Sequence, residues 1–99
     1  MTELDIALPP APNFPHIERS VDEACIAAGL TLHSKSTLKQ YRGCVHWHIR
    51  KGKQNGTLEI TLWPQAKRLW FVVHDNRRAA WIDEAVAQLK PEIEGRVGQ

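Results

Sequence analysis

The chain has 99 residues, which allows one domain with a single modest hydrophobic core. Hydrophobic residues make up 42% of it and charged residues 24%, as in an ordinary globular protein, and no segment approaches the ~20 apolar residues that span a bilayer. There is no signal-peptide pattern, and two cysteines are too few for a disulfide framework. We therefore expect a cytoplasmic protein with free thiols and no membrane contact.

The small net charge of +2 conceals an uneven distribution along the chain. Residues 31–80 contain ten basic and two acidic residues, a net charge of +8, whereas the rest contains three basic and nine acidic residues, a net charge of −6. This asymmetry indicates a polyanion or an acidic partner near the basic half, or simply attraction between the two halves of one fold.

The N-terminal segment is rich in proline, with four of the six prolines in residues 1–15. This composition predicts a mobile or extended leader that lies outside the core. We expect the α+β domain to comprise residues 16–95 and a short tail to follow at residues 96–99.

A first helix is predicted from about residue 17 to residue 28, because apolar side chains recur there at helical spacing. Two starts fit the sequence: Asn13 as the capping residue, or a capping box that begins at Ser20. Gly29 followed by an apolar residue is typical of a helix C-terminus.

Four segments with alternating apolar and polar residues come next, at about residues 30–38, 44–50, 57–63 and 68–74. The second and third are separated by the glycine-rich turn sequence 51–56, and the third and fourth by the proline-containing turn 64–67. These segments predict an antiparallel four-stranded meander, a sheet type that often leaves one face in water.

A second helix is predicted from about residue 77 to residue 90, with Asp75 and Asn76 as its cap and Pro91 ending or bending it. Its apolar positions fall on one stripe. The predicted fold is therefore a two-layer α-β-β-β-β-α arrangement of the α+β class, with both helices packed on one face of the meander.

Centring each hairpin on its turn predicts the register and the two faces of the sheet. His48 then lies opposite Glu59, and Trp70 lies opposite Thr61. The face predicted to lie under the helices consists of Val45, Trp47, Ile49, Leu58, Ile60, Leu62, Leu69, Phe71 and Val73. The open face consists of His46, His48, Arg50, Thr57, Glu59, Thr61, Trp70, Val72 and His74, joined by His33, Lys35 and Thr37.

Two histidines on the open face form a possible metal site. His46 and His48 lie on the same side of one strand, and Glu59 on the neighbouring strand adds a carboxylate, which together make the two-His-one-carboxylate set of divalent transition metals. His74 or His33 is a possible fourth ligand. A cross-strand His–Glu ion pair without a metal explains the same pattern.

Basic groups beside an aromatic side chain on the open face predict a second kind of site. Lys35, His46, His48, Arg50 and Trp70 offer cations for phosphates and a ring for a base, which are the elements that bind single-stranded nucleic acid. A tryptophan is also simply a favourable strand residue.

Two arginines, Arg77 and Arg78, are predicted in the first turn of the second helix, where cations oppose the helix dipole. Their unfavourable position indicates a phosphate-binding role, because free backbone N–H groups and guanidinium groups would point the same way. A salt bridge to Asp75 or to acids of the first helix is the structural alternative.

The sequence contains no nucleophile–base motif, glycine-rich phosphate loop or carboxylate pair. We therefore predict a non-catalytic binding module without a cofactor, whose basic open face and Arg77/Arg78 pair engage nucleic acid or another acidic partner. The alternatives are a small metal-binding protein or metal-dependent enzyme using His46, His48 and Glu59, and a homodimer formed through the open face or a strand edge.

The order helix, meander, helix with a basic start to the last helix resembles double-stranded-RNA-binding domains, and the same order is similar to the frataxin fold. The chain departs from the first by a fourth strand, by Trp81 where those domains favour small residues, and by the lack of a Lys-Lys-x-Ala-Lys run. It departs from the second because its acidic ridge is thin and consists chiefly of Glu18, Asp22 and Glu23. Both likenesses concern element order and imply nothing specific about function.

Overall fold

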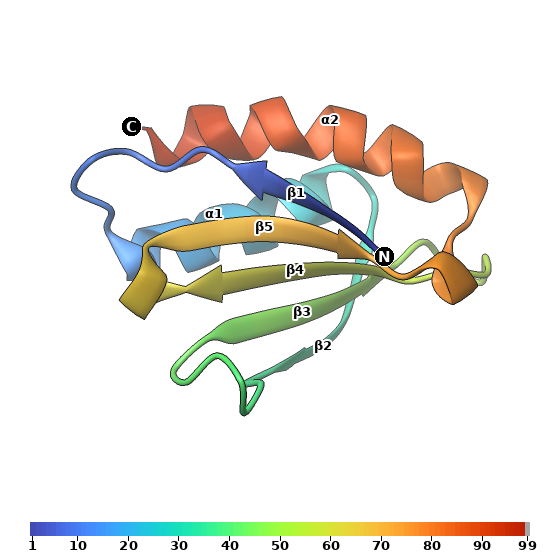
Figure 1. Ribbon diagram of the computed structural model, residues 1–99. Helices are drawn as coiled ribbons and strands as arrows, with labels where there is room; N and C mark the ends of the chain where they lie inside the picture. Colours follow the sequence, from blue (N-terminus) through green and yellow to red (C-terminus); the bar gives the residue numbers. More distant parts are fainter. Residues whose placement is uncertain (99) are drawn as a thin grey trace.

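The computed structural model, in which residues 1–98 are described, contains one five-stranded antiparallel sheet and two α-helices (Figure 1). The strand order is β1-β5-β4-β3-β2. The elements in chain order are β1 (Thr2–Ile6), α1 (Phe14–Ala27), β2 (Thr31–Ser36), β3 (Val45–Arg50), β4 (Leu58–Trp63), the 3₁₀ turn η1 (Pro64–Ala66), β5 (Arg68–Val73), the 3₁₀ turn η2 (Asp75–Arg77) and α2 (Ala80–Val97). The predicted α+β class is confirmed, with five strands instead of four.

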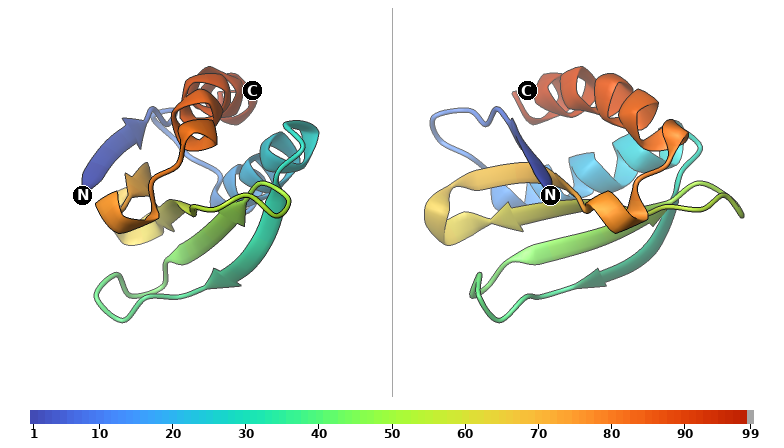
Figure 2. Two further views of the ribbon diagram at one scale, coloured as in Figure 1. Left: turned by 90° about the vertical axis from the view of Figure 1, so that its right-hand side faces the viewer. Right: turned by 45° about the vertical axis from the view of Figure 1, so that its right-hand side comes forward.

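Both helices cover the same face of the sheet, so the molecule has two layers (Figures 1 and 2). α1 packs against α2 and β2, and α2 also contacts β1. The apolar side chains of β3, β4 and β5 fill the space between the layers, where Trp47, Ile60 and Leu89 are fully buried. The Trp47 indole Nε1–H donates a hydrogen bond to Asp22 Oδ1 at 2.8 Å, which ties the sheet to α1.

The predicted register of the two central hairpins is confirmed. His48 lies opposite Glu59, Trp47 opposite Ile60, and Thr61 opposite Trp70. The short turns limit the possible pairings, and a slip of one residue would exchange the apolar and polar faces, which makes this register strongly favoured.

The prediction that residues 1–15 form a leader outside the core is wrong at its start. Residues 2–6 form β1, which pairs with β5 at the edge of the sheet, and Ile6 is buried in the core. The side chains of Asp5 and Glu3 accept from Arg68 on β5, and the amide of Ala7 donates to Glu94 of α2 at 2.8 Å. Contacts with residues more than 60 positions away therefore hold this segment in place.

The predicted face of Lys35 is also wrong, because β2 contains an irregularity between Leu32 and Ser34. Beyond it, Ser34 lies opposite His48 and Lys35 lies opposite Trp47, which places Lys35 on the helix side. A bulge adds one residue to a strand and reverses which residues point to each face.

The structure selects Asn13 from the two predicted caps of α1. Its side chain accepts a hydrogen bond from the His16 amide at 3.0 Å. The helix ends before Gly29, whose φ of 77° allows the Leu30 amide to reach the Cys25 carbonyl, as predicted for this stop.

α2 begins later and ends later than predicted. Arg77 and Arg78 precede it, Arg77 in η2 and Arg78 in an extended link, so neither lies in the first helical turn. The helix continues through Pro91 to Val97, so Pro91 does not end it. Among the helices of residues 1–98, none is long and apolar enough to cross a membrane.

Candidate functional site

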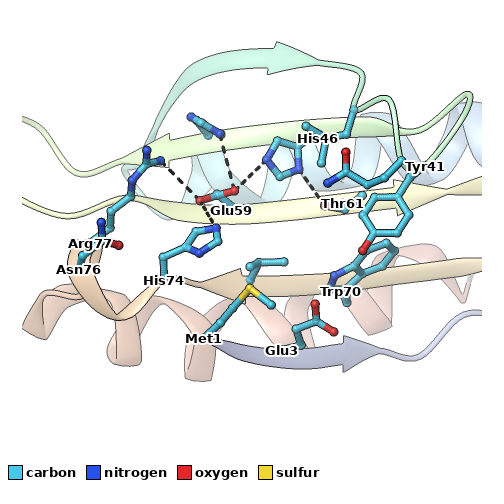
Figure 3. Close-up of a pocket in the computed structure, with 14 residues that line it drawn as sticks. Met1, Glu3, Tyr41, His46, Glu59, Thr61, Trp70, His74, Asn76 and Arg77 are labelled. Atoms are coloured by element: carbon cyan, nitrogen blue, oxygen red, sulfur yellow. Dashed lines mark hydrogen bonds and ion pairs between the residues drawn. The ribbon is translucent and has the colours of Figure 1, made fainter.

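A pocket of about 440 Å³ lies on the face of the sheet that the helices leave free (Figure 3). Its floor comes from β3, β4 and β5, and its rim from the β2–β3 loop, η2 and the N-terminal residues. The lining residues are Met1, Glu3, Leu38, Gln40, Tyr41, His46, His48, Glu59, Thr61, Trp70, Val72, His74, Asn76 and Arg77.

Glu59 is the centre of the polar part of this pocket, and its side chain is only 7% exposed. Its Oε1 lies 2.9 Å from His46 Nε2 and 3.7 Å from His48 Nε2. Its Oε2 lies 3.1 Å from His74 Nε2 and 3.6 Å from Arg77 Nη1. Three imidazoles and one guanidinium therefore converge on a single carboxylate, from β3, from the end of β5 and from η2 (Figure 3).

His46 is the most enclosed of the three histidines, and both of its ring nitrogens have partners. Nδ1 lies 2.8 Å from Thr61 Oγ1, while Nε2 faces Glu59. These two contacts come from the neighbouring strand β4, because the register places Thr61 opposite His46. The ring is thereby fixed in one orientation.

His48 lies at the edge of the pocket, about one-third exposed. Burial is the largest influence on its pKa and lowers it; the Glu59 carboxylate opposes this effect, and His46, Arg77 and His33 add to the lowering. The ring is therefore mainly neutral at pH 7, which is the form of imidazole that binds a metal.

Two buried side-chain atoms in residues 1–98 have no hydrogen-bond partner, Glu59 Oε2 and Trp70 Nε1, and both belong to residues that line this pocket. His74 Nε2 is close to Glu59 Oε2 without forming a hydrogen bond with it. Buried polar atoms without a hydrogen bond are few in native proteins, and Glu59 Oε2 has only the ion-pair contacts with His74 and Arg77.

The predicted metal ligands His46, His48 and Glu59 do come together. Their ligand atoms all lie within 4.8 Å of one another. A tetrahedral ion with bonds of about 2.1 Å keeps its ligand atoms about 3.4 Å apart. The Nε2–Oε1 distances of 2.9 and 3.7 Å lie on either side of that value, and no distance within the set exceeds 4.8 Å.

The other wall of the pocket is aromatic and apolar. Trp70 is on the predicted face, but it is fully buried, so the prediction of an exposed stacking ring is wrong. Tyr41 of the β2–β3 loop meets its ring edge-on at a centroid distance of 5.3 Å, and the Arg68 guanidinium lies over the ring at 4.1 Å. Figure 3 shows Tyr41 beside Trp70, away from the His–Glu cluster.

The residues predicted to bind nucleic acid do not form one surface. Lys35 pairs with Glu18 and Asp22 of α1 on the helix side, at 2.8 and 2.9 Å. Arg78 pairs with Asp83 at 2.8 Å and donates to the Thr2 hydroxyl. These partners account for both cations structurally.

The remaining predicted residues divide between the pocket and its surroundings. Arg50 is exposed at the end of β3 and does not line the pocket, whereas Arg77 does. Alternation placed Thr61 and His74 on the correct face. His74, predicted as a possible fourth ligand, lies 3.1 Å from Glu59 Oε2, whereas the contact of Thr61 with His46 was not predicted. Tyr41 lies in a loop without periodicity, and no sequence signal indicated its part in the site.

The cysteines contribute no reactive thiol to this site. Cys25 and Cys44 are free and buried, and neither lines the pocket. Burial, with a smaller effect of the Asp22 carboxylate, raises the pKa of the Cys25 thiol to about 12, so this thiol stays protonated at neutral pH.

Comparison with known proteins found no matching protein-family model, no matching curated protein and no matching solved structure.

Proposed function

We propose that this protein binds one divalent transition metal ion through His46 Nε2, His48 Nε2 and a carboxylate oxygen of Glu59. The observation that carries the proposal is the convergence of these three ligand atoms within 4.8 Å at the wall of a pocket. Two imidazoles and one carboxylate are a ligand set that suits zinc, iron(II) and manganese(II).

The surroundings of His46 support this proposal. Metal-bound histidines commonly use their second ring nitrogen in a hydrogen bond that fixes the ring orientation. The contact of His46 Nδ1 with Thr61 Oγ1 at 2.8 Å is of this kind, and it leaves Nε2 directed at the proposed ion. Since three protein ligands do not complete a coordination shell, the ion keeps at least one position for another ligand.

Binding of nucleic acid or an acidic protein stays a prediction, and so do a homodimer and a cytoplasmic location. Arg50 and Arg77 are the predicted basic residues that remain on the pocket side of the sheet. Lys35 and Arg78 have acidic partners, which weakens the argument from charge asymmetry. No contact in residues 1–98 favours this function over metal binding.

Calorimetric titration of tag-free protein with Zn²⁺, Mn²⁺ and Fe²⁺ tests the proposal. We expect one ion per chain for at least one of these metals. Glu59→Gln and His48→Ala each remove a ligand and should weaken binding by more than the roughly 10–100-fold that loss of an outer-shell partner costs. His16→Gln removes a histidine of α1 that lies outside both the ligand set and the pocket lining, and it should leave the affinity unchanged.

Two results would contradict the proposal. One is the absence of stoichiometric binding for all three metals. The other is binding that survives in Glu59→Gln but is lost in His16→Gln. In the first case, the cluster is an ion-pair network that serves the fold alone; in the second, the ion lies elsewhere.

A further inference from the structure

The pocket offers more than the metal ligands, because its polar and apolar parts lie side by side. Glu59 and the histidines occupy one part, and Leu38, Tyr41 and Trp70 line the other. Val72 lies opposite Glu59 on β5, between Trp70 and His74, where the two parts meet. Its volume of about 440 Å³ is within the roughly 300–1,000 Å³ of small-molecule sites. A compound of that size with one polar end and one apolar end matches this division.

The charges of the metal-loaded pocket favour an anion. A divalent ion, the Glu59 carboxylate and the Arg77 guanidinium give a net charge of about +2 when the imidazoles are neutral, as metal-binding imidazoles must be. The remaining acid in the lining is Glu3, and Arg68 lies 3.4 Å from its carboxylate. Arg77 is half exposed, and the amide of Asn76 beside it adds a hydrogen-bond donor.

We infer that the metal-loaded pocket binds a small organic carboxylate with an aromatic or apolar tail. The carboxylate takes the open position of the ion and pairs with Arg77, while the tail packs against Tyr41 and Val72. This inference rests on the proposed metal site, because the ion supplies most of the positive charge and the open position. It concerns a monomeric ligand, since the pocket is too small for a polymer.

Calorimetric titration with phenylacetate, acetate and 2-phenylethanol, each added to zinc-loaded and to metal-free protein, tests the inference. Phenylacetate should bind zinc-loaded protein at least about tenfold more tightly than acetate, because the ring buries apolar surface. Phenylacetate should bind zinc-loaded protein at least about tenfold more tightly than it binds metal-free protein. It should also bind zinc-loaded protein at least about tenfold more tightly than 2-phenylethanol does. In both comparisons the weaker complex lacks the charge-assisted contact between the carboxylate and the ion.

Two variants distinguish the contacts of the ligand's carboxylate from the contacts of its apolar tail. Arg77→Gln should weaken phenylacetate and acetate alike, by roughly tenfold for one charge-assisted contact, without weakening zinc. Tyr41→Ala should weaken phenylacetate and leave acetate unchanged, because it shortens only the apolar wall.

The outcomes distinguish this inference from the metal proposal. If zinc binds with the predicted stoichiometry but phenylacetate binds no more tightly than acetate, or equally well without zinc, the inference is wrong and the metal site stands. If none of Zn²⁺, Mn²⁺ and Fe²⁺ binds in the first titration, both are wrong. If only Mn²⁺ or Fe²⁺ binds, the same ligand titrations are made with that ion in place of zinc, and the same outcomes decide the inference.

Discussion

The two faces of the sheet are both largely buried, but they are buried in different ways. On the helix side, Trp47, Ile60 and their neighbours meet the apolar stripes of α1 and α2. On the pocket side, His46, Glu59 and Thr61 are buried without any helix above them. A loop, a 3₁₀ turn and mutual polar contacts enclose that side.

This difference indicates that one face of the sheet serves mainly the stability of the fold and that the other serves mainly its function. Burial of apolar surface stabilises the fold, whereas burial of polar groups costs free energy unless each group is paired. The pocket side retains the Trp70 indole N–H without a partner and a Glu59 oxygen that has ion-pair contacts but no hydrogen bond. A sheet face that stays polar at that cost in stability favours a role in binding over a role in folding.

The largest difference in stability loss is expected between variants of two adjacent residues that lie on opposite faces of the sheet. Trp47→Ala should lower the free energy of unfolding by about 3–5 kcal/mol, because it leaves a cavity in the core and removes the bond to Asp22. His48→Ala should lower it by less than about 1 kcal/mol, since the ring is partly exposed and its ion contact is long. Urea denaturation measures both; similar losses would contradict the division between the faces.

A second test concerns the contact between the β3–β4 turn, at Gly56, and the link that leads into α2. A Cβ at Gly56, whose φ is 98°, would lie 2.8 Å from Ala79 Cβ and 2.9 Å from the Arg77 carbonyl oxygen. Gly56→Ala should therefore cost about 2–4 kcal/mol from backbone strain and overpacking. Gly52→Ala has a positive φ but open space, and should cost only about 1–2 kcal/mol. Equal losses of stability in Gly56→Ala and Gly52→Ala would show that the contact between Gly56 and the link to α2 is not tightly packed.

Thr61→Val tests the outer support of the proposed metal site. The valine fills the same space but leaves His46 Nδ1 without a partner, so the free energy of unfolding should fall by about 1–3 kcal/mol. Zinc affinity measured by calorimetry should fall by roughly 10–100-fold. Thr61→Ser keeps the hydroxyl and should retain most of the affinity; a serine variant as weak as the valine variant would exclude this role for the hydroxyl.

The smallest effect is expected at the attachment of β1 to α2. Hydrogen bonding from the Ala7 amide, with a smaller effect of Lys90, lowers the pKa of Glu94 below its usual value of 4.5. Its contribution to stability is therefore present above pH 4.5 and is lost as the pH falls through the lowered folded-state pKa. Glu94→Gln should reduce stability at pH 7 by less than about 1 kcal/mol.

The difference between wild type and Glu94→Gln should shrink in acid. Urea denaturation of both proteins at pH 7 and at pH 3 measures it. A difference that stays constant or grows at pH 3 would mean that the ionised carboxylate does not hold the strand, and Lys90→Met provides a control for the i,i+4 ion pair alone.

The sequence predicted the centre of the sheet better than its edges. The register of β3, β4 and β5 follows from local turns and alternation, so Glu59 was correctly placed opposite His48. β1 pairs with residues about 70 positions away, and a single bulge in β2 moves the Lys35 side chain to the opposite face of the sheet. Neither a long-range pairing nor a bulge leaves a local pattern in a single sequence.

The sequence predicted the proposed metal ligands of the site but not the side chains that enclose the pocket around them. His46, His48 and Glu59 follow from strand alternation and register. The burial of Trp70 depends on Tyr41 in an irregular loop, and the position of Arg77 depends on a 3₁₀ turn where the sequence predicted a helix. Both depend on tertiary contacts that periodicity does not encode.

A crystal structure of the protein grown with whichever of Zn²⁺, Mn²⁺ and Fe²⁺ binds most tightly, with data collected at the absorption edge of that metal, tests the central claim most directly. The account predicts one anomalous peak within about 2.0–2.2 Å of His46 Nε2, His48 Nε2 and a Glu59 oxygen. A pocket without a peak, in which His46 still hydrogen-bonds directly to Glu59, would contradict it.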